Sequence, residues 1–65
     1  MANIIEGIQQ EVVRCRELLK MYEEIPQGAF GAMMLKRIIA DAEAAVAHGD
    51  TVEMIRQYEA LKECQ

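Results

Sequence analysis

Apolar residues recur at steps of three and four along the first third of the chain. The recurring positions are Ile5, Ile8, Val12, Cys15, Leu19 and Tyr22. This spacing puts one apolar side chain on the same helix face at every turn, and it is the heptad pattern by which helices pack together. Asn3 precedes the pattern and Glu6 follows three residues later, as in a capping box at a helix start. The pattern predicts a helix over residues 4–24.

The segment from Ile25 to Met34 separates this helix from the next one. It holds the only proline, the only phenylalanine and two of the four glycines of the chain. Because proline disfavours the helical conformation of the residue before it, Pro26 predicts that the first helix ends near Glu24. A second apolar stripe then predicts a helix over residues 28–48. Its members are Leu35, Ile39, Ala42 and Val46.

A third helix is predicted over residues 51–63. Asp50 and Glu53 form a second capping box, and Gly49 suits the left-handed residue that closes the preceding helix. Because the connection is so short, the second and third helices are expected to form an antiparallel helical hairpin. No strand-type alternation occurs. The expected fold is all-α, a single domain over residues 1–65 with a long N-terminal helix and a helical hairpin.

The length of the chain predicts self-association. A domain of 65 residues buries only ~60% of the surface that its unfolded chain exposes, so small domains commonly need a disulfide, a metal or a partner copy. Two cysteines without metal-ligand spacing provide no framework of disulfides or metal ligands. We therefore expect a homo-oligomer, a dimer or higher. The expected interface residues are Ile5, Ile8, Val12, Cys15 and Leu19.

Charge and hydropathy exclude several kinds of partner. A net charge of −4 with a pI near 4.8 argues against general nucleic-acid binding, which needs a basic surface. No apolar run approaches the roughly 20 residues of a membrane span. Residues 1–3 lead straight into a predicted helix, which is unlike a signal peptide. These features predict a cytoplasmic protein with reduced thiols, no membrane partner, no metal and no cofactor.

The residues that carry out common covalent catalysis are scarce. The chain has no serine and its only histidine is His48, so a Ser/His triad is excluded. A dyad of Cys15 and His48 is conceivable, but Cys15 belongs to the apolar stripe and is expected to act as a small hydrophobe. We expect no enzymatic activity.

The start of the second helix is the best candidate for a ligand site. Backbone N–H groups at a helix start attract anions, and glycines let a phosphate come close. An aromatic ring could stack on a base while nearby cations add charge. The candidate ligand-binding residues are Gly28, Phe30, Gly31, Arg16, Lys36, Arg37, Tyr22 and Tyr58. The structural alternative is that the glycines permit tight packing, Phe30 and the tyrosines fill the core, and the cations form a solvated face.

Three segments together resemble a group of small helical proteins encoded by Mu-like phages and prophages. They read IPQGAFGAMM, AEAAVAHGD and MIRQYEALK, within residues 22–62. The resemblance transfers no functional residue, but it implies a phage accessory protein that works in the host cytoplasm. Gln27, Gly28, Phe30 and the Met33-Met34 pair also bear a looser likeness to phage sponge proteins that trap cyclic-nucleotide immune signals between helical subunits.

Three functions follow as hypotheses. The first is counter-defence, by sequestering a small anionic, nucleotide-type host immune signal in a pocket between subunits. The second is a protein–protein inhibitor or adaptor that docks a helical face on a host protein. The third is a structural or assembly factor of the phage.

Overall fold

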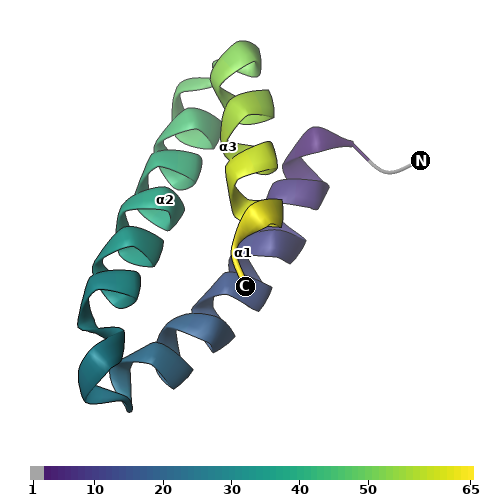
Figure 1. Cartoon of the computed structure of the whole chain (residues 1–65). Coiled ribbons are helices and arrows are strands. Elements are labelled where there is room, and N and C mark those ends of the chain that lie inside the picture. Colours follow the sequence, from purple (N-terminus) through teal and green to yellow (C-terminus); the bar gives the residue numbers. More distant parts are fainter. Residues whose placement is uncertain (1–2) are drawn as a thin grey trace.

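The computed structural model describes residues 3–65, and within this range the chain is helical without strands. The elements are α1 (Ile4–Glu23), the short 3-10 helix η1 (Pro26–Gly28), α2 (Ala29–His48) and α3 (Thr51–Glu63). Figure 1 shows α2 and α3 side by side, running in opposite directions from the turn that joins them. The all-α prediction with three helices is confirmed for the described residues.

Both expected side-chain caps are present. The Asn3 carboxamide oxygen accepts a hydrogen bond of 2.9 Å from the N–H of Glu6, and the Asp50 carboxylate accepts one of 3.1 Å from the N–H of Glu53. Gly49 has φ +67°, the left-handed conformation that closes α2. Each cap satisfies backbone groups that the end of a helix leaves without an intrahelical partner.

The corner between α1 and α2 is built around Pro26. Ile25 is extended, with φ −110° and ψ 124°, as expected for a residue before proline. The N–H of Gly28 then donates to the carbonyl of Ile25 at 2.8 Å. A Cβ on Gly28 would lie 2.3 Å from the carbonyl oxygen of Tyr22, so the two backbones touch here. Only glycine fits at this position, because any other residue would place a Cβ atom against the Tyr22 backbone.

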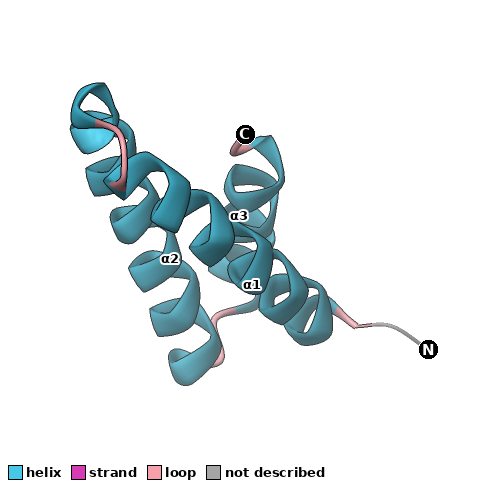
Figure 2. Cartoon of the chain, turned by 90° about the horizontal axis from the view of Figure 1, so that it is seen from below, coloured by secondary structure: helices cyan, strands magenta, loops and turns pink. Residues whose placement is uncertain are grey.

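The three helices share one core, and each contacts both of the others. Seen from below, α1 runs diagonally across the pair formed by α2 and α3 (Figure 2). The core residues come from all three helices, which explains why no single helix need be stable alone. They are Ile8, Val12, Cys15, Leu35, Ile39, Ala42, Ala45, Met54 and Leu61.

The apolar stripe of α1 serves this core rather than a contact between copies. Ile8, Val12 and Cys15 retain only 1%, 8% and 0% of their accessible surface within one chain. The expected interface is corrected at these three positions, because α2 and α3 fold back over them. Leu19 also packs partly against the core, whereas Ile5 is 39% exposed. A contact between copies would have to use other side chains.

Among residues 3–65, no helix is both long enough and apolar enough to cross a bilayer.

Candidate binding surface

The cations expected to bind an anion are each paired with an acidic side chain. The pairs are Arg16–Glu43 at 2.7 Å, Lys36–Glu23 at 3.3 Å and Arg37–Asp41 at 3.3 Å. These exposed ion pairs contribute little to stability. They matter because their carboxylates occupy the positions beside the cations where an anion would bind. The structure does not bring these three cations together into one site.

The two tyrosines lie in different parts of the fold. The ring of Tyr22 faces Gly31, whose Cβ position lies 3.5 Å from the ring, and its hydroxyl donates to the carbonyl of Gln65. The ring of Tyr58 packs on Gly7 and lies under the Lys62 ammonium, 4.9 Å from the ring centroid. Tyr22 thus joins the corner to the C-terminal residues, and Tyr58 joins α3 to the start of α1.

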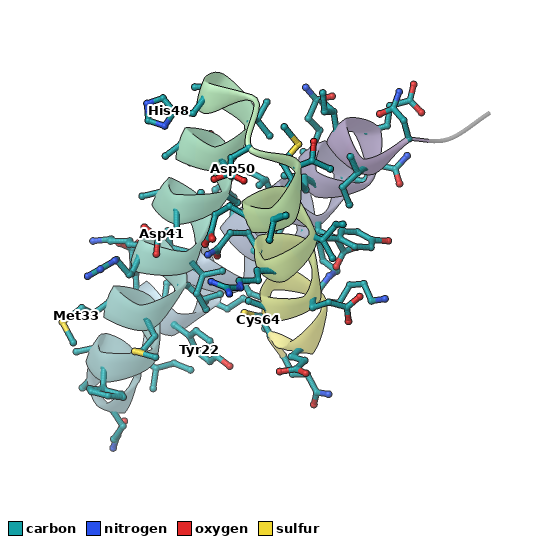
Figure 3. The ribbon with its side chains drawn as sticks, turned by 90° about the horizontal axis from the view of Figure 1, so that it is seen from above. Tyr22, Met33, Asp41, His48, Asp50 and Cys64 are labelled. Atoms are coloured by element: carbon teal, nitrogen blue, oxygen red, sulfur yellow. The ribbon has the colours of Figure 1, made fainter. Side chains whose placement is uncertain are left out.

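Phe30 lies on the surface, with 69% of its area exposed. The interpretation that it fills the core is therefore wrong. Met33 and Met34 follow it at helical spacing and are 57% and 47% exposed, so the three side chains form a ridge on the outer face of α2. Figure 3 shows Met33 pointing away from the other helices. Ile25, which is 48% exposed, lies at the same corner; we call these four residues the corner surface.

Open clefts flank the corner surface on two sides. One cleft, of about 460 Å³, separates the end of α1 from the start of α2 and includes Ile25, Pro26 and Met33. A smaller one, of about 170 Å³, lies toward the C-terminal residues and includes Met34 and Cys64. The ridge therefore projects between two clefts, so the surface at this end of the molecule is uneven as well as apolar.

The conceivable Cys15/His48 dyad is not formed. The Cys15 thiol is buried against the carbonyl of Leu61, near the end of α3. His48 is exposed at the end of α2, beside the turn that starts α3, and points away from the core in Figure 3. The two side chains thus lie at opposite ends of α3. In residues 3–65, no group of three or more His, Cys, Asp or Glu side chains could hold a metal ion.

Arg14 has a role that the sequence did not reveal. Its guanidinium donates to the carbonyl oxygens of Leu61 at 2.6 Å and Cys64 at 2.8 Å, so it caps the C-terminal end of α3. It also donates to the Glu11 carboxylate at 3.1 Å. Its carbonyl partners are distant in the sequence and carry no residue signature, so no local pattern could have identified them.

Comparisons with protein-family models, curated proteins and solved structures give no match for this chain.

Proposed function

We propose that this chain acts as a binding protein, an inhibitor or adaptor that inserts its corner surface into an apolar groove of another protein. The exposed ridge of Phe30, Met33 and Met34 is the observation that supports this function. Residues at i, i+3 and i+4 are the usual anchors by which a helix binds a groove, and a large exposed aromatic is a frequent energetic centre of such contacts.

The corner holds this ridge in place before any partner arrives. Pro26 restricts the backbone at the start of the ridge, and Gly28 fits directly against the backbone of Tyr22. A surface that is already ordered loses less conformational entropy on binding. Methionine side chains adapt to the shape of the groove that receives them. The net charge of −4 favours a partner whose groove has a basic rim.

Sequestration of a nucleotide-type signal has less support from the geometry. Within one chain the candidate cations are neutralised by acids, and Tyr22 and Tyr58 are separated. An anion site would need a second copy to contribute further groups.

Association of two copies through the corner surface is the alternative to a foreign protein, and photo-crosslinking distinguishes them. The resemblance to proteins of Mu-like phages supports a setting in the host cell, where the partner would be a host protein.

A photo-crosslinking experiment tests the proposed function. Phe30→benzoylphenylalanine is compared with Val52→benzoylphenylalanine, because Val52 is similarly exposed (66%) but lies on α3. In host cells, we expect a discrete cross-linked product at position 30 and none at position 52. Adding Met33→Gln and Met34→Gln should abolish the product while leaving helicity unchanged. Mass spectrometry of the product then distinguishes a host protein from a second copy.

Each other outcome of this experiment leads to a different conclusion. Equal products at positions 30 and 52, or none at either, would contradict the proposal. A product consisting only of two copies of the chain would replace the foreign partner with self-association. Calorimetric heat with a panel of cyclic nucleotides, retained in the Met33→Gln, Met34→Gln variant, would favour the sequestration hypothesis instead.

A further inference from the structure

The two cysteines of the chain meet at the last turn of α3, although they come from opposite halves of the sequence. The Cys15 thiol lies 3.6 Å from the carbonyl oxygen of Leu61, and the N–H of Cys64 donates to the same oxygen at 3.2 Å. The Cys64 thiol donates to the neighbouring carbonyl of Ala60 at 3.4 Å, and the Cys64 side chain packs against the core cluster that contains Cys15. Both thiols are free. The fold therefore creates a pair of neighbouring thiols.

Side chains from α1 hold the C-terminal residues over Cys15. The Arg14 guanidinium donates a hydrogen bond of 2.8 Å to the carbonyl oxygen of Cys64 and one of 2.6 Å to that of Leu61. The Tyr22 hydroxyl donates a hydrogen bond to the carbonyl oxygen of Gln65. These contacts flank Cys64 on both sides in the sequence. The backbone that carries its thiol is thus fixed at two points, which limits how far the thiol can move from Cys15.

The two thiols differ in accessibility. Cys15 has no exposed surface, whereas Cys64 is partly exposed at the edge of the core. Burial, the largest cause, and the neighbouring Cys64 raise the pKa of Cys15, and the Arg14 charge acts against this rise. A dissolved reagent therefore meets Cys64 first, because thiolate character and access govern thiol reactivity. Cys15 is placed to react second, with the sulfur of Cys64.

We propose that Cys15 and Cys64 are an oxidisable pair that forms an intramolecular disulfide in the presence of a low-molecular-weight disulfide. The Cys64 thiolate attacks one sulfur of the oxidant, forms a mixed disulfide and releases the first thiolate, which takes up a proton. The Cys15 thiol then loses its proton to water and attacks the Cys64 sulfur, releasing the second thiolate. Two protein thiols are oxidised by two electrons while the oxidant is reduced to two thiols.

The bridge would connect the end of α3 to the middle of α1 and close a loop that contains most of the chain. Cross-links that close long loops restrict the unfolded state most strongly, so the oxidised form should be the more stable one. Cys64 also lines the cleft beside Met34, so oxidation would fix one wall next to the corner surface. This inference is independent of the proposed function, and the failure of one leaves the other intact.

Oxidised glutathione is the probe for the test, added to the reduced full-length protein under native conditions. Intact-mass spectrometry should show a transient glutathione adduct, followed by a product that has lost two hydrogens and carries no adduct. This product should melt roughly 10 °C or more above the reduced protein. Cys64→Ser should give no reaction, whereas Cys15→Ala should keep a stable adduct at Cys64. Arg14→Met should prolong the adduct stage, because it releases the Cys64 backbone.

Three results would overturn the proposal. One is a stable glutathione adduct on the wild-type chain, because the second thiol would then be out of reach. Another is a disulfide between two chains through Cys64. The third is oxidation only in denaturant, which would show that the native packing keeps the thiols apart. Circular dichroism of each variant confirms that the comparison is made between folded proteins.

Discussion

A Gly28→Ala variant is expected to lose about 2 kcal/mol or more of its free energy of unfolding, lowering Tm by roughly 10 °C or more. A Cβ at this position would lie 2.3 Å from the Tyr22 carbonyl oxygen. This oxygen is a backbone atom, so the end of α1 must shift to make room. Gly28 has φ −85° and ψ 0°, which alanine can adopt, so the cost comes from the contact between backbones.

Gly31→Ala provides the matched control, because it makes the same substitution one turn further on. Its Cβ would meet the Tyr22 ring at 3.5 Å, an ordinary van der Waals distance. Alanine is also favoured over glycine inside a helix by about 1 kcal/mol, so this variant should be at least as stable as the wild type. Thermal and urea denaturation measure the stability of both variants. Equal stability of Gly28→Ala and the wild type would show that α1 and α2 do not approach this closely.

Leu61→Ala is expected to lower the free energy of unfolding by about 3 kcal/mol, through lost burial and the cavity left behind. Leu61 has 0% of its surface exposed and belongs to the core formed by all three helices. A domain of this size has a stability of only about 3–10 kcal/mol, so the variant should be partly unfolded near body temperature.

Ile55→Ala is the control on the same helix, because Ile55 is 52% exposed and of similar size. Its effect should stay within about 0.5 kcal/mol, as for surface substitutions generally. Urea denaturation of the two variants gives the comparison directly. Similar losses at both positions would mean that α3 buries a different face.

The features that sequence patterns predicted well are local ones. The caps at Asn3 and Asp50 depend on side chains that reach only three residues along the chain, and Gly49 ends α2 through its own backbone conformation. The break at Pro26 is equally local. These features are determined by interactions between residues that are close in the sequence. Helix ends could therefore be predicted to within a residue or two.

Contacts between distant segments could not be predicted in this way. The heptad stripe of α1 indicates that an apolar surface packs on it, but it does not say whether that surface belongs to the same chain. Phe30 illustrates the same limit, because its type favours burial while the geometry of the corner leaves it exposed. Arg14 caps α3 by donating to backbone carbonyl oxygens. Because every residue has a backbone carbonyl, the sequence does not mark which ones Arg14 will meet.

One chain is expected to complete its own core and to leave the corner surface for a partner. Sedimentation equilibrium and far-ultraviolet circular dichroism on one dilution series of the protein test this expectation. Helicity should stay constant at concentrations where the mass is that of a single 7.4 kDa chain. Loss of helicity in proportion to the appearance of single chains would contradict it, because Ile8, Val12 and Cys15 would then be buried between copies.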